Sequence, residues 1–218
     1  MRKLIDKRRK TVLLVECDTA GLYTKTLNIG FGVSFLLRLV YPRNLIKYIS
    51  TSTDSLLRGE IEYLYRQKQR YSYIILIGHS NERVIQLCSD KHVTWPGIAE
   101  YFTRFHPRKL FLIGCSATRW LPCKYLFEAM DSLEEIFGSP IPVTVPQSLS
   151  ILIMVLHSLD VKKIDTGLLR MVQFASFIFT KGLVFRKTKK QYQKDSNVTG
   201  MIWTAGEQAL ENMLKGQR

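Results

Sequence analysis

The fold is decided by two short stretches with a common pattern, YIILIGHS at residues 73–80 and KLFLIGCS at residues 109–116. Apolar side chains run through both with little alternation, which is typical of strands buried on both faces of a parallel sheet. Both stretches end in Gly-X-Ser, where X is His79 in the first and Cys115 in the second. These two residues are 36 positions apart, the length of one strand–helix–strand crossover. We therefore expect parallel neighbouring strands that bring His79 and Cys115 to the same edge of the sheet, where open α/β sheets place their chemistry.

Strands and helices alternate along most of the chain, which predicts an α/β fold with a mostly parallel central sheet and helices on both faces. The expected strands cover residues 11–15, 45–49, 73–77, 109–113 and 141–145. The expected helices cover residues 55–69, 97–105 and 122–137, with two apolar helices and a final helix at 204–214 in the C-terminal third. In the first helix, the side chains expected to face the sheet are Leu56, Ile61, Leu64 and Tyr65.

The length of 218 residues suits one domain, which we expect over residues 11–218 after a basic arm at residues 1–10. The formal net charge of +14 is concentrated in two places. Residues 1–10 hold six basic side chains and one acidic one, and residues 181–194 hold six basic side chains and no acidic one. The rest of the chain is nearly neutral. Local basic segments of this kind favour solvated, solubilising segments over a nucleic-acid or anionic-lipid contact, which stays open as a less favoured interpretation.

The cysteine pattern and the apolar segments indicate a cytoplasmic protein. The four cysteines, at positions 17, 88, 115 and 123, are too sparse for a disulfide framework and form no CxxC pair. The first apolar run stops at Glu16, so we expect no secretory signal. The apolar stretches at 149–159 and 171–185 contain polar residues and fall short of a transmembrane span, so we expect buried helices there. A reducing cytoplasm suits a reduced thiol.

Cysteine and histidine at adjacent strand ends indicate nucleophilic catalysis. A thiol attacks an acyl carbon as the thiolate, and a nearby histidine can take its proton and later deliver one to the leaving group. Gly78 and Gly114 allow the chain to turn sharply before each residue, and the backbone N–H groups of Ser80 and Cys115 can then point at a developing oxyanion. Either residue alone is more often structural, but two of them in matching frames favour a site.

The residues IILIGHSN (74–81), VTWPGIAEYF (93–102) and PRKLFLIGCSAT (107–118) together resemble the core of the caspase-like (clan CD) cysteine peptidases. The similarity is greatest to the CHAT branch, which is related to caspases and separase. It covers roughly residues 11–145. It rests on a strand that ends in histidine, followed one crossover later by a strand that ends in cysteine.

The resemblance implies a caspase-like three-layer sandwich and a cysteine endopeptidase that needs no cofactor and no metal. It implies His79 as general base and acid, Cys115 as nucleophile, and an oxyanion hole formed by the N–H groups of Cys115 and of the residue after the histidine. That residue is Ser80 here, where the family has glycine. The implied substrate is a partner protein. Related bacterial proteins act in immunity or cell-death systems under the control of a sensor protein, which implies a similar effector role.

Substrate preference in this family is often set by a side chain at the end of the first strand. Glu16 and Asp18 occupy that region, and an acidic residue there would suit a basic substrate residue. Asp18 can equally cap the next segment of the chain, so both interpretations stay open.

Other interpretations of the same residues are weaker. The stretch GHSNE at residues 78–82 starts like the serine-hydrolase elbow G-x-S-x-G, with Ser80 as its serine, but Glu82 replaces the last glycine. The remaining histidines, at positions 92, 106 and 157, lack partners at metal-ligand spacing, so we expect no metal site. The second functional hypothesis is a catalytically inactive caspase-like module that binds protein partners or nucleic acid through its basic segments.

Overall fold

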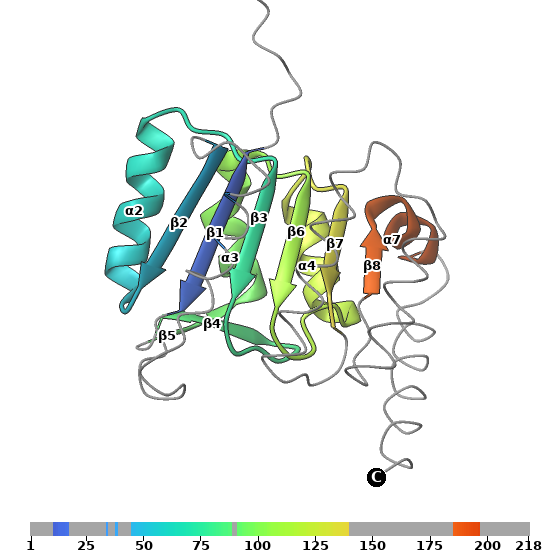
Figure 1. Cartoon of the computed structure of the whole chain (residues 1–218). Helices are drawn as coiled ribbons and strands as arrows, with labels where there is room; N and C mark the ends of the chain where they lie inside the picture. The colour runs from blue at the N-terminus through green and yellow to red at the C-terminus, as the bar shows by residue number, and fades with distance from the viewer. Residues whose placement is uncertain are drawn as a thin grey trace, which may run out of the picture.

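The computed structural model describes residues 11–17, 45–88, 91–139 and 185–196, together with Ser34 and Arg38. These residues form an α/β fold around one six-stranded sheet (Figure 1). The strand order is β2-β1-β3-β6-β7-β8. The strands are β1 (Val12–Cys17), β2 (Ile46–Thr51), β3 (Tyr73–Ile77), β6 (Lys109–Ile113), β7 (Glu135–Gly138) and β8 (Phe185–Thr188).

The sheet is mostly parallel, as the sequence predicts. Strands β2, β1, β3, β6 and β7 all run in the same direction, and only β8 runs antiparallel, against β7. The order reverses direction between β1 and β3, because the chain passes from β1 to β2 on one side and then crosses to β3 on the other. In open α/β sheets such a switch point is where ligands bind.

The other described elements are a hairpin and four helices, besides a short 3-10 turn after α3. The hairpin pairs β4 (Val84–Cys88) with β5 (Lys91–Thr94) and lies at the carboxyl edge of the sheet (Figure 1). The helices are α2 (Asp54–Arg66), α3 (Trp95–Phe102), α4 (Trp120–Ala129) and α7 (Lys189–Ser196). The Thr53 side chain caps α2, and the Thr94 side chain caps α3, which carries Pro96 in its first turn.

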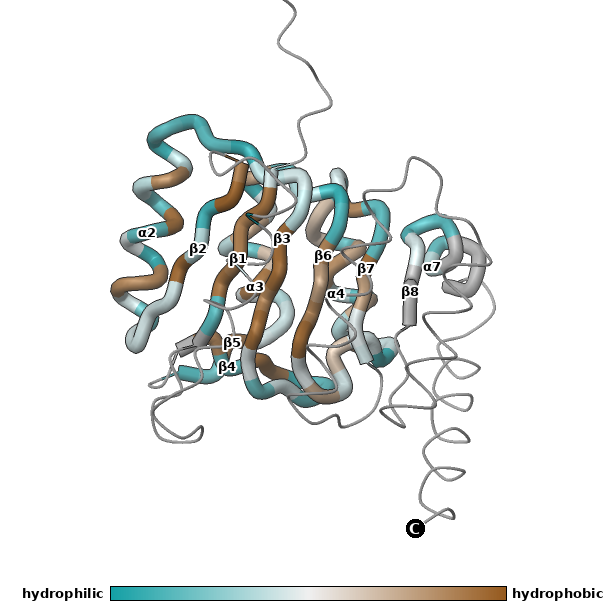
Figure 2. The backbone as a smooth tube through the Cα atoms, viewed as in Figure 1, coloured by the Kyte–Doolittle hydropathy of each residue, from teal (hydrophilic) through white to brown (hydrophobic). Residues whose placement is uncertain are grey.

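The main core lies between one face of the sheet and these helices. Along β1, β3 and β6, alternate side chains enter one cluster with residues of α2, α3, α4 and α7. The strands at the centre of the sheet carry the most hydrophobic residues (Figure 2). Members of the cluster include Leu13, Val15, Leu57, Ile61, Ile74, Leu76, Ile98, Phe102, Leu110, Leu112, Leu126, Phe127 and Tyr192.

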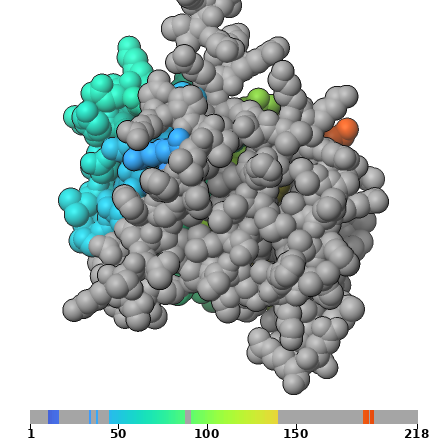
Figure 3. Space-filling model, viewed as in Figure 1, coloured from blue at the N-terminus to red at the C-terminus, as the bar shows by residue number. Residues whose placement is uncertain are grey.

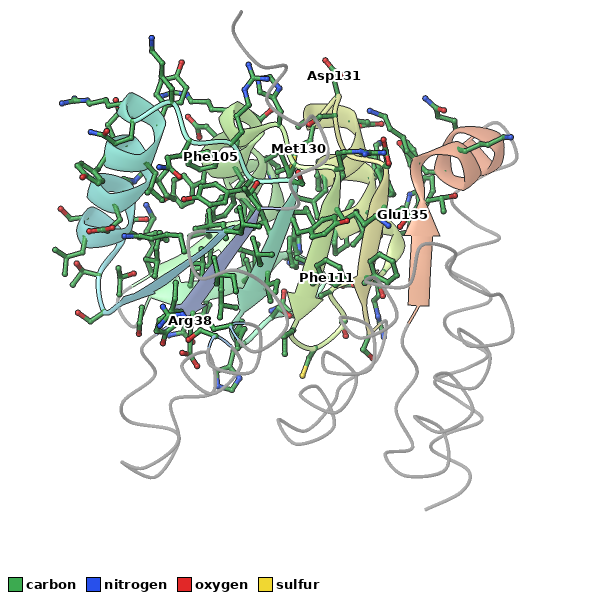
Figure 4. The ribbon with its side chains drawn as sticks, turned by 45° about the horizontal axis from the view of Figure 1, so that its top comes forward. Arg38, Phe105, Phe111, Met130, Asp131 and Glu135 are labelled. Atoms are coloured by element: carbon green, nitrogen blue, oxygen red, sulfur yellow. The ribbon has the colours of Figure 1, made fainter. Side chains whose placement is uncertain are left out.

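The opposite face of the sheet is also buried, which explains the unalternating apolar runs. Phe111 stacks on Phe137 at 5.0 Å and meets the Tyr73 ring edge-on at 6.2 Å. At the amino ends of the strands, Lys109 and Glu135 are cross-strand partners and form an ion pair of 2.7 Å, with both side chains at most 15% exposed. Phe111 and Glu135 are labelled in Figure 4.

The prediction of one continuous helix over residues 122–137 is wrong. Helix α4 ends at Ala129, and residues 135–138 form strand β7 beside β6. The apolar period that suggested the helix runs through Leu126 and Met130, both of which are in the core, but the chain turns after Met130. Glu135 made the strand hard to recognise, because its buried partner Lys109 is 26 positions away in the sequence.

Helix α2 is rotated relative to its prediction. Leu57, Ile61 and Leu64 face the core, whereas Leu56 and Tyr65 are exposed. This helix and β2 form one side of the molecular surface (Figure 3).

Several predictions fall outside the described residues. These are the basic arm at 1–10, the strand at 141–145, the apolar stretches at 149–159 and 171–185, and the helix at 204–214. The described helices cover one face of the sheet, so helical cover of the second face stays a prediction. Among the described residues, no helix has the length and apolar character needed to cross a bilayer.

Candidate functional site

The structure confirms that the strands leading to His79 and Cys115 are parallel neighbours. Strands β3 and β6 pair in register, with Ile77 opposite Ile113 as the last pair. The ladder continues one step further, because the Gly78 N–H donates to the Ile113 carbonyl at 3.1 Å. His79 and Cys115 therefore occupy equivalent positions, each two residues beyond the end of its strand and each half-buried.

The two glycines before these residues are required by close packing. No described glycine has a positive φ, so neither Gly78 nor Gly114 is needed for a left-handed turn. A Cβ on Gly78 would lie 2.0 Å from the Gln86 carbonyl oxygen. A Cβ on Gly114 would lie 2.2 Å from Ser80 Oγ and 2.7 Å from the Gly78 carbonyl oxygen. Side chains at either position would push the two strand ends and the hairpin apart.

Ser80 connects the two strand ends. Its hydroxyl donates a hydrogen bond of 2.7 Å to the Cys115 carbonyl. Ser80 is not among the residues with positive φ, so serine at this position costs no backbone strain. It forms an antiparallel bridge with Ile85, whose hydrogen bonds use the neighbouring His79 carbonyl and Asn81 N–H. The bridge therefore does not use the Ser80 N–H, which was predicted to contribute to an oxyanion hole.

The backbone after His79 is fixed by the hairpin. The His79 carbonyl accepts from the Gln86 N–H at 2.7 Å, and the Asn81 N–H donates to the Val84 carbonyl at 3.0 Å. The Asn81 carbonyl in turn accepts a 3.2 Å hydrogen bond from the indole of Trp95. Because Trp95 is fully buried in the core, this bond connects the loop to the interior of the protein.

The segment after Cys115 is a tight turn with one strained residue. Ser116 has φ +56° and is buried, although its side chain disfavours the left-handed region. The Arg119 N–H donates to the Ser116 carbonyl, and the Thr118 N–H donates to the Ser139 carbonyl, both at 3.3 Å. Backbone strain of this kind clusters at functional sites.

An ion pair also joins the two loops. Arg119, just before α4, lies 3.4 Å from Glu82, which comes three positions after His79. The arginine is 22% exposed and the glutamate 50% exposed. The contact spans the two segments that carry His79 and Cys115.

Of the two acidic candidates for a substrate pocket, the structure describes Glu16. Its side chain is buried at the carboxyl end of β1, opposite Ile77 of β3, and its Oε2 accepts a 2.6 Å hydrogen bond from the Tyr48 hydroxyl. Registered neighbours in a parallel sheet share a face, so Glu16 lies on the same face as Ile77. Asp18 lies outside the described residues.

The hairpin beside His79 is held by a cluster of charges around Asp54. The Asp54 carboxylate accepts hydrogen bonds from Arg58 at 2.8 Å, from Lys91 of β5 at 3.0 Å and from the Tyr101 hydroxyl of α3. Burial raises the pKa of Asp54, but the three hydrogen bonds outweigh this effect and lower the pKa to about 2. The cluster therefore joins α2, α3 and the hairpin.

The remaining histidines are candidate metal ligands by residue type, and Cys123 is, besides Cys115, a free cysteine whose side chain the structure describes. Among the described residues, no group of three or more His, Cys, Asp or Glu side chains could hold a metal ion. His92 and His106 are exposed, and His157 lies outside the described part of the chain. Cys123 is fully buried in the core face of α4.

Part of the basic segment at 181–194 belongs to the fold. Lys189 donates from Nζ to the carbonyls of Met130 and Asp131, both at 3.3 Å, at the end of α4. A cation there neutralises the carbonyl end of the helix. Met130 and Asp131 are labelled in Figure 4.

Sequence reasoning missed the contacts that connect the two loops. The bond between Ser80 and Cys115 and the pair between Glu82 and Arg119 join residues 35 and 37 positions apart. The matching Gly-X-Ser frames were the available signal, because they placed a serine beside each reactive residue. Comparison with protein-family models and with curated proteins gives no match to this chain.

Proposed function

We propose that this protein is a caspase-like cysteine endopeptidase with Cys115 as nucleophile and His79 as general base and acid. One observation carries the proposal. Strands β3 and β6 are adjacent, parallel and in register, so that His79 and Cys115 stand at equivalent positions past the strand ends. The order of the strands along the chain also agrees with the caspase-like resemblance, in which the histidine strand precedes the cysteine strand by one crossover.

The proposed reaction is hydrolysis of a peptide bond. His79 takes the thiol proton of Cys115, and the thiolate sulfur forms a bond to the carbonyl carbon of the substrate. The carbon–nitrogen bond then breaks, and the amine leaves with the proton from His79. Water, deprotonated by His79, hydrolyses the thioester, which releases the acid and restores the thiol.

The negative charge that develops on the substrate oxygen needs donors that are already in place. The N–H groups of Ser80 and Cys115 are the candidates. Both belong to backbone segments fixed by hydrogen bonds, through Asn81 and Gln86 on one side and through Ser80 Oγ on the other. Donors that are held before the substrate arrives cost no reorganisation during the reaction.

A basic residue before the cleaved bond is the substrate feature that Glu16 would recognise. Its carboxylate is buried at the carboxyl end of β1, next to the end of β3, and a charge pair there would be partly desolvated. We propose a partner protein as substrate, in the cytoplasm, with control by a sensor protein.

The test uses an activity-based probe that labels reactive thiols, followed by a peptide library. Cys115→Ala is expected to abolish labelling at that position, and His79→Ala to slow it by about 100-fold or more. Two variants serve as controls. Cys123→Ala removes a different, buried thiol from α4, and His92→Ala removes an exposed imidazole from β5, so Cys115 should be labelled normally in both. Labelling and cleavage that are unchanged in His79→Ala and Cys115→Ala would overturn the dyad. Wild-type protein that is neither labelled nor active on any peptide would favour the catalytically inactive module instead.

A further inference from the structure

We infer that Ser80 is a positioning residue that sets the distance between the histidine and cysteine segments by holding the Cys115 carbonyl. The inference rests on the proposed function and deepens it, because it assigns a role at the same site to a residue whose hydroxyl binds the backbone carbonyl of Cys115.

The first observation is the contact itself. Ser80 Oγ lies 2.7 Å from the Cys115 carbonyl oxygen, in a partly buried position, and joins residues 35 positions apart. Ser80 comes directly after His79, so one hydroxyl connects the histidine segment to the peptide unit that contains Cys115. A hydrogen bond of this length is close to the optimum for a hydroxyl donor.

The second observation is that the neighbouring strand end is shaped to receive this hydroxyl. Gly114 leaves the space that Ser80 fills, since a Cβ there would stand 2.2 Å from Ser80 Oγ and 3.1 Å from Ser80 Cβ. A glycine at position 80 would leave Gly114 facing an unfilled gap. Ser80 and Gly114 thus form a complementary pair across β3 and β6.

The third observation is the strain immediately after Cys115. The bonded carbonyl belongs to the peptide that links Cys115 to Ser116, and Ser116 is held at φ +56°. Fixing that carbonyl fixes the plane of the peptide and hence the start of the strained turn. Without the Ser80 hydroxyl, the turn has one restraint fewer that ties it to the histidine segment.

The role is therefore geometric. Nucleophile and base must keep a narrow range of separations for efficient proton transfer, and small displacements have large effects on rate. Each of the two segments is fixed to its own neighbours, the histidine segment to the hairpin and the cysteine segment to Ser139. The Ser80 bond is a direct, partly buried contact that fixes one segment relative to the other.

The test measures alkylation of Cys115 by iodoacetamide across pH, with peptide mass spectrometry to separate it from the other three cysteines. Ser80→Ala and Ser80→Gly are expected to slow alkylation at neutral pH by about tenfold, the effect of one hydrogen bond. Their pH profiles should move toward that of His79→Ala. Ser80→Thr keeps the hydroxyl and should recover most of the rate. A purely structural role would lower the melting temperature of the Ala and Gly variants but leave the profile of the folded protein unchanged.

The outcomes separate this inference from the proposed function. If His79→Ala changes the rate and the profile but Ser80→Ala and Ser80→Gly match the wild type, the positioning role is overturned and the dyad stands. If His79→Ala itself matches the wild type, the proposed dyad fails and the inference fails with it. Slow alkylation in Ser80→Gly with recovery in Ser80→Thr supports both the proposed dyad and the positioning role of Ser80.

Discussion

The two Gly-X-Ser segments have matching sequences but different structures. After β3, the chain leaves the sheet in a relaxed conformation and continues into the β4–β5 hairpin, and Ser80 directs its hydroxyl across to the next strand end. After β6, the chain enters a tight turn, and Ser116 is buried with a positive φ. The shared Gly-X-Ser frame therefore specifies a position at the sheet edge, while the next residues of the chain and the neighbouring elements determine the conformation.

The glycines differ in the same way. Gly78 faces the backbone of the hairpin, whereas Gly114 faces a side chain, Ser80, as well as the Gly78 carbonyl. Backbone cannot move without breaking its own hydrogen bonds, but a serine side chain can rotate. The same substitution should therefore lower the free energy of unfolding by different amounts in the two segments.

The largest effect is expected for Gly78→Ala. The new Cβ would lie 2.0 Å from the Gln86 carbonyl oxygen, so the hairpin must shift, and Gln86 also donates to the His79 carbonyl. We expect a loss of about 3 kcal/mol or more in the free energy of unfolding, measured by urea denaturation. Gly59→Ala is the control, because nothing lies within 4 Å of that position on α2 and the change should stabilise the helix by about 0.5–1 kcal/mol. Similar stabilities for the two variants would contradict the packing role of Gly78.

A smaller effect, about 2 kcal/mol, is expected for Gly114→Ala. Combining it with Ser80→Gly should recover about 1 kcal/mol, because the double variant removes the 2.2 Å contact with Ser80 Oγ but keeps the 2.7 Å contact with the Gly78 carbonyl. A double-mutant cycle of unfolding free energies measures this coupling. Additive effects of the two substitutions would show that Ser80 and Gly114 are not a complementary pair.

The sequence predicted the sheet edge better than the loops beyond it. Two unalternating apolar runs predicted the buried strands β3 and β6, because burial on both faces leaves that pattern whatever the neighbours are. Their register followed from the matching Gly-X-Ser frames one crossover apart. The Ser116 strain and the Ser80 hydrogen bond left no such pattern, since each depends on a residue brought close by the fold. Strand β7 was missed for the same reason, because Glu135 is an acceptable strand residue only beside Lys109.

A third effect is expected at low pH, where the histidine segment should lose support that the cysteine segment does not depend on. The carboxylate of Asp54 supports the hairpin through Lys91, and its folded pKa of about 2 lies below the ordinary value of 3.8. A lowered pKa stabilises the folded state above about pH 4, and the contribution is lost as the pH falls toward 2. Allowing for solvent screening, the loss should be about 1–2 kcal/mol.

Asp54→Asn should remove the contribution of this carboxylate to the free energy of unfolding at neutral pH. The stability of the variant should then fall less steeply between pH 4 and pH 2, as measured by denaturation between pH 2 and 7. Hydrogen exchange should show earlier opening of the hairpin and the histidine segment than of the turn after Cys115. Asp131→Asn, at an exposed carboxylate, is the control and should leave the curve unchanged. Equal opening of both segments would mean that the hairpin is not a separate support.

The smallest effect is expected for the ion pair that spans the two loops. Glu82 is half exposed and lies 3.4 Å from Arg119, so water and salt screen the attraction. We expect a coupling of about 0.5 kcal/mol from a double-mutant cycle with Glu82→Gln and Arg119→Gln, falling further in 1 M salt. Thiol labelling of Cys115 should change less than twofold in Glu82→Gln, in contrast to the tenfold effect expected for Ser80→Ala. If the glutamate variant instead slowed labelling as much as the serine variant, the exposed ion pair, and not the partly buried hydroxyl, would control the spacing of the two segments.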